Sequence, residues 1–242
     1  LKAYLALSDR CQVAALCDIF PGKAQSLKEK YGLDAAEVYG DYNEMLKRPD
    51  IDLVSVCTPP FTHLPVSIAC MRAGKHVLLE KPMALSLSEC DEMIAVQKET
   101  NTYLGVVCQN RFTKDNQILK TLIESKIAGR VLFGQVESFW YRGHSYYDLW
   151  WRGTWEKEGG GCTMNHGVHQ IDLLNWIMGP PETVTAVLTN VAHNNAETED
   201  LSAAILTYKS GAVITFAVNL VTHGQYQSCL LYTSDAADDL IG

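Results

Sequence analysis

Three apolar stretches in the first hundred residues are each followed by side chains that could contact a ligand. Asp18 follows the stretch 11–17, Thr58-Pro59-Pro60 follows 51–57, and Glu80-Lys81-Pro82 follows Val77-Leu78-Leu79. If these stretches are parallel strands of an open α/β sheet, their carboxyl ends share the edge at which ligands bind. A carboxylate, a hydroxyl and an ammonium group would then meet along one edge.

The segments around these residues alternate between strand-like and helix-like patterns. Local signals mark the helices: Pro21 opens one, Gly74 follows the end of another, and Ser86-x-x-Glu89 is a capping box. Alternation with short connections predicts a doubly wound parallel sheet with right-handed crossovers. We expect strands at 11–19, 51–60, 75–81 and 102–112, and helices at 21–33, 41–46, 62–72 and from 86 onward.

The second part of the chain has a different pattern. Lys209-Ser210-Gly211 separates two apolar stretches, as in a hairpin, so this part is expected to form an α+β domain with an antiparallel sheet. We therefore expect one domain at 1–106, a second at 107–228, and a remaining tail at 229–242. The second domain is predicted to hold helices at 113–129 and 161–179 and strands at 131–143, 182–193, 200–208 and 212–221.

The composition narrows the possible partners. The chain has 242 residues, 47% of them hydrophobic, and a net charge of −8, which argues against nucleic acid as a partner. No apolar run is long enough to span a membrane. The eight cysteines lack C-x-x-C spacing, and the seven histidines add no metal-ligand spacing. We expect small core thiols in the reducing cytoplasm and no metal site.

Five motifs, in order along residues 1–228, resemble the Gfo/Idh/MocA family of NAD(P)-dependent oxidoreductases. That family acts mostly on sugars, inositols and related polyols. The resemblance implies a Rossmann-type domain followed by an α+β domain with a large, open, mainly antiparallel sheet. The motifs are DLVSVCTPPFTH (52–63), AGKHVLLEKPM (73–83), QNRF (109–112), WRGTWEKEGGG (151–161) and GVHQIDLL (167–174).

Both ends of the chain depart from the family pattern. The family's first strand and its G-x-G-x-x-G turn are missing, and we expect them upstream of residue 1. The segment CLLYTSDAADDLIG (229–242) resembles the translation of a transposase adapter used in sequencing libraries. We expect it to be non-native and not to continue the sheet; the alternative is a divergent natural tail. The chain is then a fragment that is inactive by itself.

The resemblance places the cofactor at the sheet edge. Asp18 would accept hydrogen bonds from ribose hydroxyls and repel a 2′-phosphate, which favours NAD over NADP. The plainer interpretations are a turn aspartate at position 18 and a simple helix-start histidine at position 63. The remaining cofactor contacts implied are Thr58, Pro59, Pro60, His63, Glu80, Lys81 and Gln109.

The resemblance also implies the catalytic residues. Lys81 would lie between nicotinamide and substrate, donate a hydrogen bond to the reacting hydroxyl and stabilise the developing alkoxide. His169 would act as general base, a task that suits a group titrating near neutrality. Asn165 stands where many members carry Asp, and it cannot titrate, so proton transfer falls to His169. A surface lysine and an interior histidine are the plainer alternatives.

Aromatic side chains and an arginine precede the glycines of the second domain. Aromatic faces stack on sugar C–H groups, and arginine binds hydroxyls or carboxylates. The alternative is packing between domains or at an oligomer interface. The expected substrate contacts are Lys81, Arg111, Tyr146, Trp151, Arg152, Asn165, His169 and Asp172, with Trp155 in the same cluster.

The function expected from this resemblance is hydride transfer between nicotinamide and a secondary hydroxyl or ketone of a sugar, inositol or related polyol. Two alternatives remain: an NAD-retaining glycoside hydrolase of the same fold, and a non-catalytic regulator that senses dinucleotide or sugar. We expect a small-molecule partner, and a homodimer or homotetramer formed through the sheet of the second domain.

Overall fold

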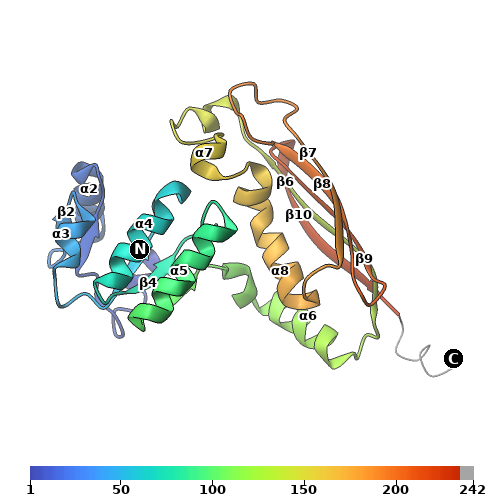
Figure 1. Cartoon of the computed structure of the whole chain (residues 1–242), viewed down its shortest axis with the longest axis horizontal. Helices are drawn as coiled ribbons and strands as arrows, with labels where there is room; N and C mark the ends of the chain where they lie inside the picture. Colours follow the sequence, from blue (N-terminus) through green and yellow to red (C-terminus); the bar gives the residue numbers. More distant parts are fainter. Residues whose placement is uncertain (235–242) are drawn as a thin grey trace. The chain divides into compact units, whose positions relative to one another are not determined.

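The computed structural model describes residues 1–234, and the chain divides into two compact units (Figure 1). Unit 1 consists of residues 1–58, 62–80 and 88–105. Unit 2 consists of residues 59–61 and 81–87 together with everything from Val106 onward. Lys81 therefore groups with unit 2, although it lies inside the expected first domain.

The strands of unit 1 form two short ladders. Strand β1 (Ala15–Cys17) pairs in parallel with β2 (Glu37–Tyr39), and β3 (Leu53–Val56) pairs in parallel with β4 (His76–Leu79), with β5 (Leu104–Val106) beside β4. The expectation of a parallel sheet is confirmed. Within residues 1–234, no strand pairing joins β1 to β3.

The helices of unit 1 begin and end where local chemistry favours it. Pro21 occupies the first turn of α2, and Gly32 ends that helix with φ of 61°, a left-handed conformation that glycine adopts without strain. Asp41 caps α3 through a 2.8 Å bond from Asn43 N. The helices are α1 (Lys2–Leu5), α2 (Pro21–Tyr31), α3 (Tyr42–Leu46), α4 (His63–Arg72) and α5 (Leu87–Thr100).

Unit 2 is built on a five-stranded sheet with the order β10-β6-β9-β8-β7. All neighbouring pairs are antiparallel except β6 with β9, so the expected mainly antiparallel sheet is confirmed. The strands are β6 (Val131–Tyr141), β7 (Thr183–Thr189), β8 (Leu201–Thr207), β9 (Val213–Asn219) and β10 (Val221–Thr233).

One face of this sheet is covered by helices (Figure 1). Buried Val136, Ile214, Phe216 and Val218 alternate along β6 and β9 and pack with Leu174 of α8. This alternation gives the sheet one apolar face, which is its share of the core. The helices of unit 2 are α6 (Lys114–Ser125), α7 (Trp155–Glu158) and α8 (Val168–Met178), the last preceded by a π-helical turn at Thr163–Gly167.

The structure corrects three expectations about the strands. Residues 229–233 do continue the sheet, because Cys229 pairs with Val136 and Thr233 with Val131. Strand 102–112 is shorter than expected, since Gln109–Phe112 forms a 3-10 helix. Strand β2 was not expected at all. Residues 235–242 of the expected non-native tail lie outside the described residues.

The cysteines were expected in the core, and this is wrong for half of them. All eight are free thiols; Cys70 and Cys162 are buried, whereas Cys11, Cys17, Cys57 and Cys229 are exposed. Among residues 1–234, each helix is too short or too polar to cross a bilayer.

Candidate active site

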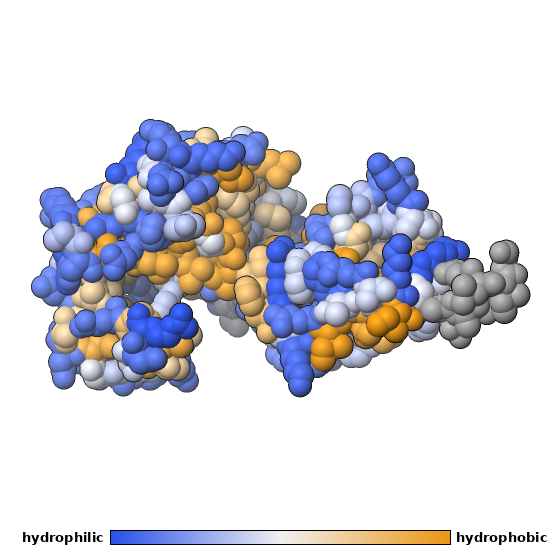
Figure 2. Space-filling model, turned by 90° about the horizontal axis from the view of Figure 1, so that it is seen from below, coloured by the Kyte–Doolittle hydropathy of each residue, from blue (hydrophilic) through white to orange (hydrophobic). Residues whose placement is uncertain are grey.

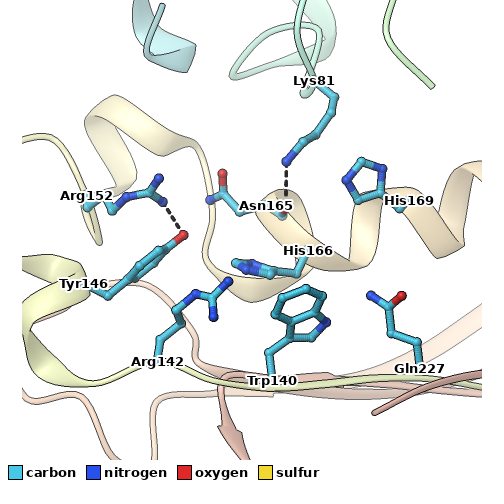
Figure 3. Close-up of a pocket in the computed structure, with 9 residues that line it drawn as sticks. All are labelled: Lys81, Trp140, Arg142, Tyr146, Arg152, Asn165, His166, His169 and Gln227. Atoms are coloured by element: carbon cyan, nitrogen blue, oxygen red, sulfur yellow. Dashed lines mark hydrogen bonds between the residues drawn. The ribbon is translucent and has the colours of Figure 1, made fainter. Parts of the chain in front are cut away.

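A pocket of about 210 Å³ opens within unit 2 (Figure 3). Lys81 enters from one side, Trp140, Arg142 and Gln227 from the opposite side, and the helix around Asn165 lies between them. The sequence had singled out Lys81, Tyr146, Arg152, Asn165 and His169. The pocket also contains Trp140, Arg142, His166 and Gln227, which sequence reasoning missed.

Gly161, the last of the three glycines before the π-helical turn, lets the chain pass tightly against Glu199. A Cβ atom on Gly161 would lie 1.9 Å from the Glu199 carbonyl oxygen, so no side chain fits there. The Glu199 carboxylate accepts bonds from Gly161 N (2.8 Å) and Thr163 N (3.1 Å), which satisfies donors at the start of the turn. This anchoring presents Asn165, His166 and His169 to the pocket.

We call Lys81, Asn165 and His169 the lysine half of the pocket. Lys81 Nζ donates to the main-chain carbonyl of Asn165 at 2.9 Å. The Asn165 side-chain amide donates to the carbonyls of Gly160 (3.3 Å) and Gly161 (3.2 Å). The main chain at position 165 therefore holds the ammonium group, and replacing the usual Asp by Asn leaves that bond in place.

We call Trp140, Arg142, Tyr146, Arg152 and His166 the arginine half. Arg152 donates to the Tyr146 hydroxyl and, at 3.2 Å, to Glu158, while its guanidinium lies 4.1 Å from the Tyr146 ring centre. Glu158 is only 1% exposed. Burial raises the pKa of its carboxyl, and the bonds from Gly153 N and Arg152 oppose that rise.

Arg142 carries the charge that is least compensated in the arginine half. Its guanidinium lies 4.9 Å from the Trp140 ring centre and 5.4 Å from that of Tyr146. Its guanidinium donates a hydrogen bond to the carbonyl of Tyr141, at 3.0 Å. No carboxylate among residues 1–234 lies within ion-pair distance of it. A partly buried guanidinium group without a carboxylate partner suits an anionic group of a ligand.

Two polar ring atoms of the pocket have no hydrogen-bond partner among the described residues. They are Trp140 Nε1 and His166 Nδ1, both buried, with ring centres 6.0 Å apart. Burial, together with the charges of Arg142, Lys81 and Arg152, lowers the pKa of His166 to about 3. His166 is therefore neutral at ordinary pH. Buried polar atoms are normally paired, so these two are exceptions among the described residues.

Several expected substrate contacts lie outside this pocket. Arg111 and Asp172 bind each other, with Arg111 Nε donating to the carboxylate at 2.8 Å, which ties the 3-10 helix Gln109–Phe112 to α8. Trp151 stacks on Arg152 at 4.4 Å. Trp155 donates through Nε1 to the carbonyl of Glu197. The roles of Arg111, Asp172 and Trp151 in substrate binding remain predictions, as does that of Gln109 with the cofactor.

The expected cofactor residues of unit 1 follow the carboxyl ends of its strands. Asp18 follows β1, and its Oδ1 accepts a bond from Phe20 N at 2.8 Å. Thr58 and Glu80 follow β3 and β4, and Glu80 N donates to Val56 O. His63 is 1% exposed, and its Nε2 lies 2.8 Å from the Thr58 carbonyl oxygen, so this ring fixes the loop.

These positions fit a dinucleotide in part. Asp18 gives a carboxylate for ribose hydroxyls, and the Thr58 loop begins at the same kind of strand end. Pro59 and Pro60 group with unit 2. The printed sequence contains no G-x-G-x-x-G turn for the phosphates. Among residues 1–234, no cluster of three His, Cys, Asp or Glu side chains is arranged to hold a metal ion.

Family models match both parts of the chain. Residues 1–108 match the oxidoreductase family with an NAD-binding Rossmann fold, and residues 116–237 match the GFO/IDH/MocA C-terminal domain. The chain belongs to the GFO/IDH/MocA oxidoreductase family.

Named relatives of this GFO/IDH/MocA protein are dehydrogenases. It is 30% identical over 213 residues to myo-inositol 2-dehydrogenase of Thermotoga maritima, covering 86% of this chain and 61% of the relative. It is 28% identical over 179 residues to D-glucoside 3-dehydrogenase of Escherichia coli K12, covering 74% and 50%. The chain thus spans between half and two thirds of these relatives' lengths.

Solved structures similar to this chain include complexes with NADH and a sugar ligand. The WlbA dehydrogenase of Chromobacterium violaceum, in complex with NADH and UDP-GlcNAcA, has 35% identity and a TM-score of 0.89, covering 96% of this chain and 67% of that one. The Bordetella pertussis enzyme, with the same two ligands, has 33% identity and a TM-score of 0.88, covering 95% and 71%.

Proposed function

We propose that this protein is an NAD-dependent dehydrogenase that interconverts a secondary hydroxyl and a ketone on a negatively charged sugar derivative. The observation that carries the proposal is the pairing of the two halves of one pocket. Lys81, Asn165 and His169 offer groups for proton handling, and Arg142 and Arg152 lie in the same pocket. Relatives that are inositol and glucoside dehydrogenases support the reaction class.

In this proposal the lysine half handles the reacting oxygen. Lys81, held by the Asn165 carbonyl at 2.9 Å, donates a hydrogen bond to the substrate hydroxyl and stabilises the alkoxide that develops during oxidation. His169 accepts the hydroxyl proton and returns it in the reverse direction. Asn165 holds the Lys81 ammonium group in place through its main-chain carbonyl and transfers no proton. Bound NAD would supply the carbon that accepts hydride.

The residues that would hold NAD are those at the strand ends of unit 1. Asp18 would accept bonds from the ribose hydroxyls, and its charge would oppose a 2′-phosphate. Thr58, Pro59, Pro60 and Glu80 would contact the remaining cofactor surface, with His63 fixing the loop through Thr58. NAD is accordingly the proposed cofactor, ahead of NADP.

The arginine half is the part of the pocket that selects a negatively charged substrate. Three cationic side chains, Lys81, Arg142 and Arg152, line the pocket, and Glu158, which is bonded to Arg152, is buried beside it. Charge-assisted bonds from guanidinium to carboxylate are among the stronger hydrogen bonds in proteins. The presence of UDP-GlcNAcA, a sugar acid, in two relatives of at least 33% identity supports this class.

The test is a panel of matched substrates, assayed on the protein expressed from its complete gene. Each sugar acid is compared with its neutral counterpart, and NADH formation is followed by absorbance. We expect turnover with NAD and a higher kcat/KM for the acid. No turnover with any sugar or polyol would contradict the dehydrogenase, and tightly retained NAD with aglycone release but no net NADH would indicate a glycoside hydrolase instead.

We also propose that the complete protein self-associates through the outer face of the unit 2 sheet. By the pairing register, Val187, Ile205, Leu230 and Tyr232 lie opposite the buried face, and each is roughly half exposed or more. Figure 2 shows a hydrophobic strip along one edge of this unit on the side in view. Light scattering on the complete protein should show a dimer or tetramer.

We also propose that the protein, with its free thiols, is cytoplasmic, which cell fractionation would test.

A further inference from the structure

The buried histidine His193 connects a carboxylate to the main chain of Arg142. Its ring is 3% exposed, with Nδ1 2.8 Å from Asp200 Oδ2 and Nε2 2.7 Å from the Arg142 carbonyl oxygen. Both partners are acceptors, so the ring makes both bonds only when both nitrogens carry hydrogen. The His193 ring therefore bridges the Asp200 carboxylate and the Arg142 carbonyl oxygen.

Asp200 is the anchor of this arrangement. It is fully buried and accepts bonds from the main-chain N–H groups of Val191 (2.9 Å), Ala192 (3.0 Å) and His193 (3.1 Å). Burial by itself would raise the pKa of Asp200, but these bonds and the one from the His193 ring outweigh it, so the pKa lies below 3.8. An ionised Asp200 therefore fixes the segment that follows β7 and holds the His193 ring through Nδ1.

The same anchor reaches Arg142 by a second route. Arg142 N donates to Leu220 O at 2.9 Å, and Leu220 N donates to Asp200 O at 2.8 Å. Both polar groups of the Arg142 main chain are thus held, one through His193 and the other through Leu220. Arg142 follows directly after β6, whose last residue, Tyr141, pairs with Val221. Its side chain leaves this fixed point and lines the pocket.

We propose that His193, held by Asp200, is a positioning residue that fixes Arg142 so that its guanidinium meets the acidic group of the substrate. This rests on the proposed function above. His193 does not line the pocket and touches no reacting atom. The rings that face it, Tyr147 at 4.8 Å and His144 at 5.5 Å between centres, complete its surroundings with Asp200 and Arg142.

The alternative is that His193 only stabilises the fold. A fold-stabilising residue would, when changed, lower activity equally toward charged and neutral substrates. A positioning residue changes the preference between them and acts through Arg142. These outcomes differ in a ratio of rates, which loss of folded protein does not alter.

The experiment compares His193→Gln with His223→Gln, a control at an exposed histidine that stacks on Tyr141 without a bond to Arg142. Crystal structures of both variants show where the Arg142 guanidinium lies. The kcat/KM for a sugar acid is divided by that for its neutral counterpart. We expect His193→Gln to move the Arg142 side chain and to lower this ratio about tenfold through KM, as loss of one well-placed ionic hydrogen bond would.

Arg142→Ala should lower the ratio further, and adding His193→Gln to it should change nothing more, because the two act as one unit. An unmoved Arg142, an unchanged ratio or additive effects would overturn the inference. If wild-type protein shows no preference for acids, the charge requirement of the proposed function fails, while the position of Arg142 in the variant still decides this inference. His193→Asn serves if the first variant does not fold, and failure of both to fold would show a purely structural role.

Discussion

The two halves of the pocket differ in how many of their residues lie in contiguous motifs. The lysine half comes from two continuous motifs, GKHVLLEKPM and GGGCTMNHGVH, whose residues are neighbours in sequence. The arginine half draws Trp140 and Arg142 from the end of β6, Tyr146 and Arg152 from the connection that follows, and His166 from the π-helical turn. Chemistry common to a family can be stored in short motifs, whereas selection among substrates depends on how distant segments pack.

The largest effect is expected in the lysine half. In the complete protein, Lys81→Ala removes the charge that stabilises the alkoxide, so kcat should fall by at least ~100-fold. NAD binding should persist, as measured by fluorescence titration. Lys98→Ala, on the exposed surface of α5, is the matched control and should retain full turnover. Unchanged turnover in Lys81→Ala would refute its catalytic role.

Substitutions in the arginine half should affect KM more than kcat. Arg142→Ala should raise KM for a sugar acid by about 10- to 100-fold, the range for losing a hydrogen bond to a charged group, with a smaller change in kcat. KM for the neutral counterpart should change little. Lys157→Ala removes a positive charge outside the pocket lining and serves as control. Equal losses for both substrates would mean that Arg142 does not read the substrate's charge.

This contrast also explains what could be predicted from the sequence. Lys81, Asn165 and His169 were expected because the contiguous motifs around them resemble those of a family, and Tyr146 and Arg152 because of their residue types. The parallel and antiparallel sheets followed from apolar periodicity and turn residues. Trp140, Arg142 and Gln227 were missed because their approach depends on strand order and register, which no local pattern encodes. His166 had a signal, since it directly follows Asn165 in the glycine motif.

The errors at strand ends have a related cause. The segment 229–233 has no alternation that points to a particular partner, yet it pairs with β6 along the edge opposite β9. Edge pairing satisfies backbone donors and acceptors irrespective of side chain. The sequence QNRF predicts the end of a strand, but Arg111 binds Asp172, 61 residues away, and the chain forms a 3-10 helix there.

Unit 1 offers a smaller test, at the cofactor end. Asp18→Ser in the complete protein should weaken NAD relative to NADP, because it removes an acceptor for ribose hydroxyls and the repulsion of a 2′-phosphate. We expect the ratio of the two dissociation constants to shift by about tenfold, the size of one ionic hydrogen bond. Asp9→Ser provides a control, since Asp9 lies outside the strand ends. If the ratio of the NAD and NADP dissociation constants is the same before and after the change, Asp18 does not bind the ribose.

The smallest effect is expected from the second histidine of the pocket. His166 has a pKa of about 3 because burial and the cations around it disfavour its charged form, so it stays neutral through the working range of pH. His166→Gln, which keeps a side chain able to donate and accept hydrogen bonds, should weaken substrate binding a few-fold at most. The pH profile of kcat between pH 5 and 9 should keep its shape. A shifted profile would show that His166 takes part in proton transfer.

The same shift predicts how His166 affects stability. Its folded pKa lies below the ordinary 6.5, so between about pH 3 and 6.5 the unfolded chain binds a proton that the folded chain does not. The folded protein therefore loses stability as pH falls through 6.5, and His166→Gln should reduce that loss. Urea unfolding of both proteins at pH 7.5 and pH 5 measures the difference. If the two lose equal free energy of unfolding between these pH values, the folded protein does not disfavour the charged form of His166.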